Sequence, residues 1–346
     1  MIGAMAAADP DTWQPDVLGA GWQARTLHLR PDEQGAGAVA TLVRRTPAAR
    51  DAEGPDGTVP DEGGARRAVL YVHGYVDYFF QTHLADAWAD AGYTFYAVDL
   101  RDHGRSIRDG RLPNYTPRLA AYTEELDRAA RILREEEGND VVVVNGHSTG
   151  GLVAALWAHG RRGRAVVGRR PMDALVLNSP WLELNRPWFD RVVTTHLVDL
   201  VVGRVAPTAV VGSLSPAYGQ WLARSDGGAW EYDLTWKPHE GFGARAGWLR
   251  TIRRAHAAVA RGLAIDVPVL VCTSDASGPA KGEHDALDRT DSVLAVEHMW
   301  QRAPRLGADV TVVRIPGGVH DLVLSPEPAR TAYLDAVREW VQRRVP

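Results

Sequence analysis

Cysteine is nearly absent from this chain of 346 residues, which contains only Cys272. A single cysteine excludes an internal disulfide and any metal site built from several thiolates. Because Cys272 lies inside the apolar run VPVLVCTS, we expect it to be a small buried core residue. Lysine is also rare, with only Lys237 and Lys281 among the 39 basic residues, and we attribute this to coding bias.

Long hydrophobic runs and an excess of charge are also missing. No uninterrupted apolar run reaches the roughly 18 residues that span a membrane. The first residues lack the basic start and continuous apolar core of a secretory signal. The 39 basic and 43 acidic residues give a formal net charge of −4, which excludes the basic footprint of nucleic-acid binding. We expect a cytoplasmic protein without a nucleic-acid partner or stable membrane insertion, and the sequence indicates no oligomeric state.

What the chain does contain is an alternation of strand-like apolar runs and amphipathic helical stretches. This alternation is typical of βαβ units, and it predicts an α/β fold with a mostly parallel eight-stranded sheet and helices on both faces. The runs TLHLR and AVATLVRR, at residues 26–30 and 38–45, are expected to form an antiparallel edge. Residues 46–64 are rich in Gly, Pro, Asp and Ala, which predicts a flexible surface loop.

The alternation fails between about Glu183 and Asp266. That segment contains many tryptophans and prolines and too few β-branched runs to add strands. We therefore expect residues 1–182 and 266–346 to form the core domain and residues 183–265 to form an inserted helical cap above the sheet. Its tryptophans could line an apolar channel or pack the cap's own core, and the sequence favours neither.

The motif GHSTG, at residues 146–150, follows four valines and precedes a helical stretch. This is the strand–turn–helix context of G-x-S-x-G, in which a strained turn exposes the hydroxyl of the central serine. Side chains at Gly146 and Gly150 would collide with the neighbouring strand and helix. Ser148 is therefore the candidate nucleophile, and the amide of Thr149, directly after it, is a candidate donor to an oxyanion.

A serine hydroxyl needs a base, and chain order helps to choose one among the 12 histidines. In this topology the order is serine, then acid, then histidine, with the histidine in a loop after the last strand. His320 has that position in VTVVRIPGGVHDLVLS, where Gly317 and Gly318 allow the loop to fold back over the sheet edge. His147 is expected to pack beneath the turn.

These residues resemble the α/β-hydrolase superfamily, and in particular its monoacylglycerol lipase, lysophospholipase and serine-aminopeptidase-like branch. The similarity covers about residues 66–182 and 266–344. The segments that carry it are YVHGY at 71–75, VDLRDHGRS at 98–106, NGHSTGG at 145–151 and IPGGVHDLVLS at 315–325. The segment between these two stretches has little similarity, and such enzymes carry a variable cap there.

The resemblance implies two further roles. The second oxyanion donor follows the His-Gly pair and would be the amide of Tyr75. The triad acid lies after the strand VPVLVCTS, where Asp275, Asp288 and Asp291 compete. In the family the acid usually precedes an apolar pair just before a helix, and TDSVL has that form. This favours Asp291, with Asp288 and Asp275 as alternatives.

The sequence thus predicts a serine hydrolase with the triad Ser148, Asp291 and His320 and no cofactor. Its expected substrate is a small-molecule carboxylic ester with an apolar, medium-sized acyl group, similar to a monoacylglycerol or lysophospholipid. An amidase or aminopeptidase using the same triad, or a non-catalytic binding protein with this fold, is the alternative. The acidic stretch GEHDALDRTD fits no defined ligand spacing, so no metal is expected.

Overall fold

The computed structural model describes residues 12–46, 65–164, 169–184, 202–279 and 282–345. A nine-stranded sheet runs through these residues in the order β1-β2-β3-β5-β4-β6-β7-β10-β11. The strands are β1 Gln14–Pro15, β2 Trp22–His28, β3 Val39–Arg45, β4 Arg67–Val72, β5 Thr94–Asp99, β6 Val141–His147, β7 Ala174–Asn178, β10 Val269–Ser274 and β11 Val310–Ile315.

The pairing of the strands confirms the expected mostly parallel sheet with an antiparallel edge. β2 and β3 pair antiparallel, as do β1 with β2 and β3 with β5. In the rest of the sheet, in the order β5-β4-β6-β7-β10-β11, each strand pairs parallel with the next. The sheet has one strand more than predicted because the two-residue β1 extends its antiparallel edge.

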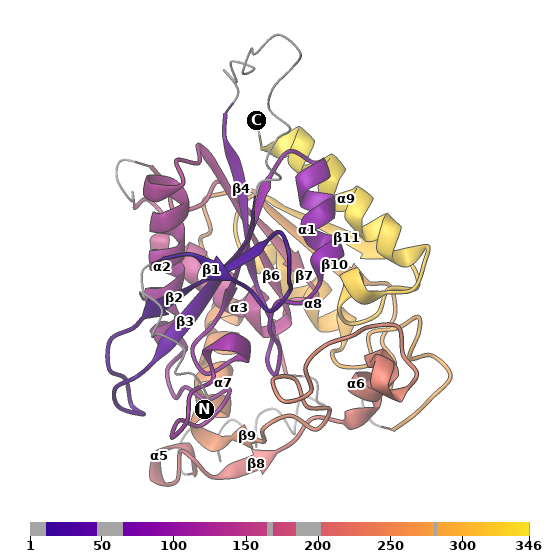
Figure 1. Ribbon diagram of the computed structural model, residues 1–346. Coiled ribbons are helices and arrows are strands. Elements are labelled where there is room, and N and C mark those ends of the chain that lie inside the picture. The colour runs from indigo at the N-terminus through magenta and orange to yellow at the C-terminus, as the bar shows by residue number, and fades with distance from the viewer. Residues whose placement is uncertain (1–11, 47–64, 165–168, 185–201, 280–281, 346) are drawn as a thin grey trace.

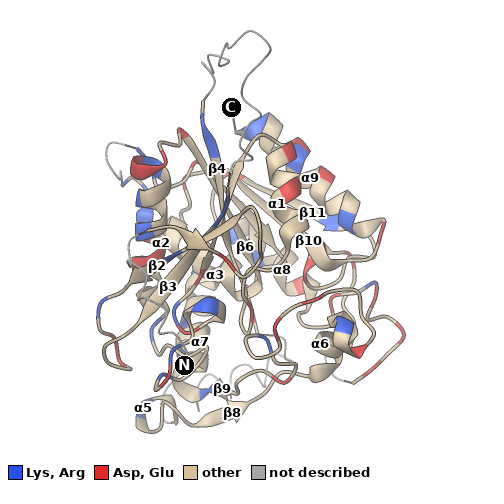
Figure 2. Cartoon of the chain, viewed as in Figure 1, with Lys and Arg blue, Asp and Glu red and all other residues tan. Residues whose placement is uncertain are grey.

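Helices cover both faces of the sheet (Figure 1). α1 and α9 lie side by side on one face, and α2, α3 and α7 pack on the other. The α-helices of the core are α1 Thr82–Asp90, α2 Thr123–Arg131, α3 Ser148–Arg161, α8 Val296–Arg302 and α9 Ala329–Arg344. Acidic and basic residues are mixed along α2 and α9 (Figure 2).

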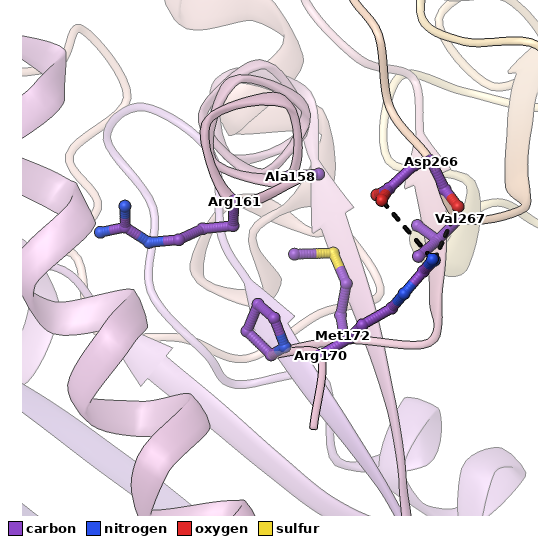
Figure 3. Close-up of a pocket in the computed structure, with 7 residues that line it drawn as sticks. Ala158, Arg161, Arg170, Met172, Asp266 and Val267 are labelled. Atoms are coloured by element: carbon purple, nitrogen blue, oxygen red, sulfur yellow. Dashed lines mark hydrogen bonds and ion pairs between the residues drawn. The ribbon is translucent and has the colours of Figure 1, made fainter. Parts of the chain in front are cut away.

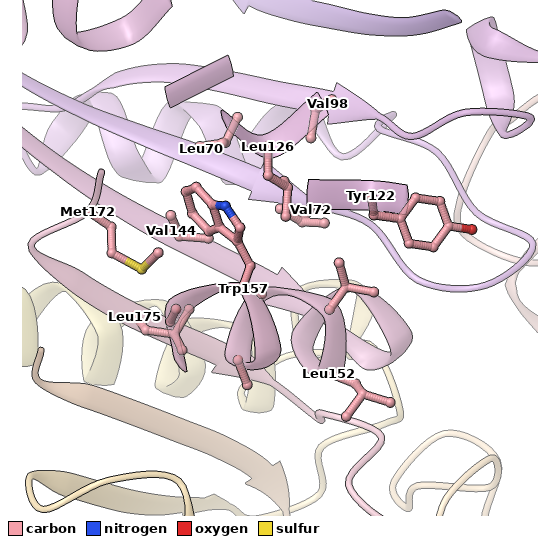
Figure 4. Close-up of a cluster of buried hydrophobic side chains, with 14 of the residues drawn as sticks. Leu70, Val72, Val98, Tyr122, Leu126, Val144, Leu152, Trp157, Met172 and Leu175 are labelled. Carbon is pink, nitrogen blue, oxygen red and sulfur yellow. The ribbon is translucent and has the colours of Figure 1, made fainter. Parts of the chain in front are cut away.

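The central strands are apolar because both of their faces are buried. In β4, Leu70 and Val72 point into the cluster beneath α2 and α3, whereas Val69 and Tyr71 point into the cluster beneath α1 and α9. Figure 4 shows the first cluster, where Trp157 of α3 packs among strand residues. Each such side chain contributes about 1.5–3 kcal/mol when fully buried. Cys272 is fully buried in β10 and free, and burial raises the pKa of its thiol.

The segment between β7 and β10 differs from its prediction in one respect. It contains α5 Gly203–Val205, α6 Pro216–Leu222 and α7 Ala246–Arg261, but also a short antiparallel ribbon of β8 Val210–Gly212 and β9 Ala244–Arg245. The expectation of no strands was wrong because two or three residues suffice for such a ribbon, too few to form a recognisable β-branched run. α5, β8 and β9 lie together at one end of the molecule (Figure 1). Nearly all of the expected loop at 46–64 lies outside the described residues.

Candidate active site

The junction of β6 and α3 places Ser148 at the carboxyl end of the sheet. Its backbone has a φ of +52°, a left-handed conformation that is strained for a residue other than glycine. A Cβ at Gly146 would approach Gly151 Cα to 2.8 Å, and one at Gly150 would approach the His73 carbonyl oxygen to 2.1 Å. The glycines therefore permit the close approach that the sharp turn requires.

The structure brings the hydroxyl of Ser148 within 3.0 Å of His320 Nε2. On the other side of the ring, His320 Nδ1 lies 2.9 Å from Asp291 Oδ2. A carboxylate can only accept, so the proton is on Nδ1 and Nε2 remains free to accept from the serine hydroxyl. Ser148, His320 and Asp291 are 9%, 5% and 0% exposed, so this chain of hydrogen bonds is largely shielded from water.

Asp291 is held by the backbone on its other oxygen. Its Oδ1 accepts from the amides of Val293 at 2.9 Å and Leu294 at 2.8 Å, which leaves Oδ2 directed at His320. The two competing carboxylates lie elsewhere. Asp275 accepts from the amide of Gly317 at 3.0 Å, and Asp288 forms an exposed ion pair with Arg289.

The loop after β4 presents three consecutive amides near Ser148. The amide of Gly74 donates to Asp77 Oδ2 at 3.3 Å, and that of Val76 donates to Asn114 Oδ1 at 2.8 Å. No acceptor among the described residues engages the amide of Tyr75 between them. Thr149 is the second residue of α3, where backbone amides have no partner within the helix. Gly74 lies against Ser148, since a Cβ there would be 3.2 Å from the serine Cβ.

A polar network that the sequence did not predict lies behind His320. Asp321 accepts from Asn178 Nδ2 at 2.7 Å and from Gln81 Nε2 at 3.1 Å. Its own amide donates to the hydroxyl of Tyr218, at 3.1 Å, in α6. The hydrogen bonds on both sides of Asp321 fix the backbone next to His320. The only sequence signal was its position directly after the predicted histidine.

His147 packs beneath the turn in this arrangement. It is 5% exposed, its Nδ1 lies 3.2 Å from the Asn178 carbonyl oxygen, and its ring lies 5.0 Å from that of His320. Burial lowers the pKa of His147, although the nearby Asp321 carboxylate acts in the opposite direction. Burial therefore favours the neutral form of this ring.

Aromatic residues of the inserted segment pack on the core around this site. The ring of Trp248 stacks on that of Tyr75 with centroids 4.0 Å apart, and the ring of Trp181 lies 5.6 Å from Trp248. The backbone amide of Trp181 donates to the Ser148 carbonyl oxygen at 3.0 Å. Trp221, Trp230 and Trp236 pack against the cluster beneath α1 and α9. Trp188 lies outside the described residues.

One pocket of the structure lies at the far end of α3 from Ser148 (Figure 3). Its lining includes Arg161, Met172 and Asp266. Arg170 crosses it, with Nη1 2.8 Å from the Asp266 carbonyl oxygen. The cationic groups here are engaged by the chain itself, and nothing in this pocket approaches the serine.

The described residues lack two further kinds of feature. They contain no group of three or more His, Cys, Asp and Glu side chains arranged to hold a metal ion. Within the same residues, no helix is long and apolar enough to cross a membrane.

Known structures with this arrangement of elements include lipases. A monoacylglycerol lipase of Paleococcus ferrophilus is 20% identical, with 81% of this chain and 98% of that chain covered and a TM-score of 0.57. A soluble variant of monoglyceride lipase from Saccharomyces cerevisiae, in complex with a substrate analog, is 15% identical, with coverages of 92% and 96% and a TM-score of 0.60. At such identities the likeness establishes the fold.

Sequence comparison identifies the family. No curated protein matches this chain. The family model described as serine aminopeptidase, S33, a hydrolase family, matches residues 63–327. Because this match extends over most of the chain, the protein belongs to the serine aminopeptidase S33 family of hydrolases and has the α/β-hydrolase fold.

Proposed function

We propose that this protein is a serine hydrolase that cleaves carboxylic esters with apolar, medium-sized acyl groups, such as those of monoacylglycerols or lysophospholipids. The observation that carries the proposal is the continuous contact from Ser148 Oγ through His320 to Asp291, at 3.0 Å and 2.9 Å. The strained backbone of Ser148 supports it further, since such strain is maintained where a function requires it.

In this mechanism Ser148 Oγ attacks the ester carbonyl carbon while its proton passes to His320 Nε2. Asp291 stabilises the resulting imidazolium through Nδ1. The amides of Tyr75 and Thr149 donate to the oxyanion of the tetrahedral intermediate. When the intermediate collapses, His320 gives its proton to the leaving alcohol. A water molecule, deprotonated by His320, then releases the acid from the acyl-enzyme and restores Ser148.

The buried acidic residues beside the site favour an ester over the free amino end of a peptide. An aminopeptidase needs a carboxylate that can bind the substrate's ammonium group. Asp77 is paired with Lys237, Glu183 with Arg253 and Arg302, and Asp321 accepts from two amide side chains. Each of these carboxylates already has its partners within the chain, and cleavage of an aminoacyl amide is therefore the second choice.

The deciding experiment is labelling with a fluorophosphonate probe. In the wild-type protein, Ser148 Oγ should displace fluoride from the probe and become phosphonylated. Ser148→Ala should remain unlabelled. Arg224→Met, which removes an exposed ion pair with Glu231 and a hydrogen bond to the Ala229 carbonyl oxygen, is a folded control that should be labelled like the wild type. A wild type that does not react would reject the hydrolase and favour a binding protein with this fold.

A further inference from the structure

The loop that carries Tyr75 is held at both of its neighbouring amides. Gly74 donates to the carboxylate of Asp77, and Val76 donates to the side chain of Asn114. Asn114 is 2% exposed, and its own Nδ2 donates to the Asp102 carbonyl oxygen at 3.2 Å. The direction of the Tyr75 amide therefore depends on two side chains, one on each side.

Asp77 is in turn held by a residue from the inserted segment. Lys237 Nζ lies 2.6 Å from Asp77 Oδ1, while Oδ2 of the same carboxylate accepts from Gly74. Asp77 is 2% exposed. The Lys237 ammonium lowers the pKa of Asp77 against the opposing effect of burial. A charge-assisted bond of this kind is shorter and stronger than a neutral one, so it orients the carboxylate firmly.

The chain around Lys237 is docked on the same loop by further contacts. The amide of Asp233 donates to the hydroxyl of Tyr78 at 2.7 Å, and the ring of Trp236 meets that of Tyr78 edge to face. Lys237 itself lies over the rings of Phe80 and Tyr232, at 5.7 Å and 5.8 Å from their centroids. These contacts hold the stem and the ammonium of Lys237 in place independently of Asp77.

We propose that Lys237 is a positioning residue for the oxyanion hole: through Asp77 it fixes the His73–Gly74 peptide and with it the direction of the Tyr75 amide that follows, so that docking of the inserted segment completes the site. The inference rests on the proposed hydrolase function. Lys237 reaches no reacting atom in this arrangement. Its effect is on the angle at which the Tyr75 amide meets the developing oxyanion, and it therefore affects the transition state more than substrate binding.

The test compares Lys237→Met with Lys237→Arg. Methionine keeps the apolar stem and removes the charge, and misplacement of one oxyanion donor should slow phosphonylation by about 10- to 100-fold. On p-nitrophenyl esters we expect kcat to fall by a similar factor while KM stays within about twofold, because ground-state contacts are unchanged. Lys237→Arg should restore most of the rate, since arginine can still pair with Asp77.

Three further variants exclude a merely structural explanation. Arg224→Met removes a cation of the same segment that does not reach residues 74–77, and its rates should equal those of the wild type. Asn114→Gly removes the other acceptor but tolerates the φ of +55° at that position, and it should slow the reaction in the same way. Should Lys237→Met fail to fold, Lys237→Gln, which loses the charge-assisted bond to Asp77 while keeping a polar end, takes its place and should slow the reaction in the same direction.

The outcomes separate the two proposals. If the wild type is labelled and folded Lys237→Met or Lys237→Gln reacts at the wild-type rate, the role of Lys237 is overturned while the hydrolase stands. A rise in KM of about 10- to 100-fold with unchanged kcat would also overturn the role of Lys237. If the wild type is not labelled at all, the hydrolase itself is rejected, and the inference about Lys237 is rejected with it.

Discussion

Asp291 faces His320 with one carboxylate oxygen while the backbone of its own turn holds the other. Oδ2 lies 2.9 Å from His320 Nδ1, and Oδ1 accepts from the amides of Val293 and Leu294. The carboxylate therefore cannot rotate without losing two hydrogen bonds. This rigidity defines the tautomer of His320 as well as the orientation of its ring.

Asp291→Asn should consequently impair turnover far more than it impairs folding. The asparagine amide favours the wrong imidazole tautomer, so we expect kcat on p-nitrophenyl esters to fall on the order of 10⁴-fold. Asp275→Asn and Asp288→Asn, at the two carboxylates that do not contact His320, are the matched controls and should keep near-normal kcat. A normal rate for Asp291→Asn would remove it from the mechanism.

Two glycines of α3 offer a paired test of the sharp turn. Gly150→Ala places a Cβ 2.1 Å from a backbone oxygen, and we expect a loss of about 3 kcal/mol or more in the free energy of unfolding. Gly160→Ala is in the same helix, with no atom within 4 Å of the new Cβ, and should be neutral or stabilise by about 0.5–1 kcal/mol. Chemical denaturation of both variants gives the comparison. Equal stabilities would contradict the packing described here.

Glu183 predicts a specific sensitivity to acid. Burial opposes its ionisation, but the hydrogen bonds from Arg253 and Arg302 prevail and lower its pKa from 4.5 to about 2. Because the unfolded state binds this proton more readily, the stabilisation is complete above pH 4.5 and is lost as pH falls through about 2. The contribution is on the order of 3 kcal/mol.

Melting temperatures measured between pH 6 and pH 2 check this expectation. The difference between wild type and Glu183→Gln should shrink as the pH falls through that window, because protonation removes the advantage of the carboxylate. Glu231→Gln, in an exposed ion pair, serves as the control and should follow the wild type throughout. A constant difference between wild type and Glu183→Gln would show that the ionisation of this carboxylate does not stabilise the fold.

A panel of substrates distinguishes reaction classes. We expect p-nitrophenyl esters of medium acyl length to be hydrolysed fastest, because the site lies among the rings of Tyr75, Trp181 and Trp248. Aminoacyl anilides should react at least about 100-fold more slowly, since an unsatisfied ammonium group costs more than 2–3 kcal/mol to bury. Preferred cleavage of the anilides would instead favour the aminopeptidase.

Much of the fold could be predicted because its signals are local. The four valines at 141–144 stand between a polar turn and the glycine motif, and β6 Val141–His147 begins with them. The helix expected just after TDSVL begins at Val296, and before it the amides of Val293 and Leu294 turn back to bind the Asp291 carboxylate. The sequence pattern shows the apolar residues of that turn but does not show the hydrogen bonds that their amides make.

The supports of the candidate site could not be predicted in the same way. Asp77 and Lys237 are 160 residues apart in sequence, and Val76 and Asn114 are 38 apart. Neither pair has a spacing that a helix or strand period would reveal. Lys237 was visible only as a rare residue type, for which composition offered a simpler explanation. Such contacts depend on how the inserted segment folds against the core, which is a tertiary property.

The buried position of Cys272 gives the molecule an internal reporter. As the chain's single thiol, enclosed within the central sheet, it is shielded from water-borne reagents until the sheet opens. The rate at which a thiol-reactive dye labels native protein will therefore follow opening of the strands themselves, without interference from movements at the surface. The protein thus carries, without any engineering, a probe that separates loss of the scaffold from loss of the chemistry at its edge.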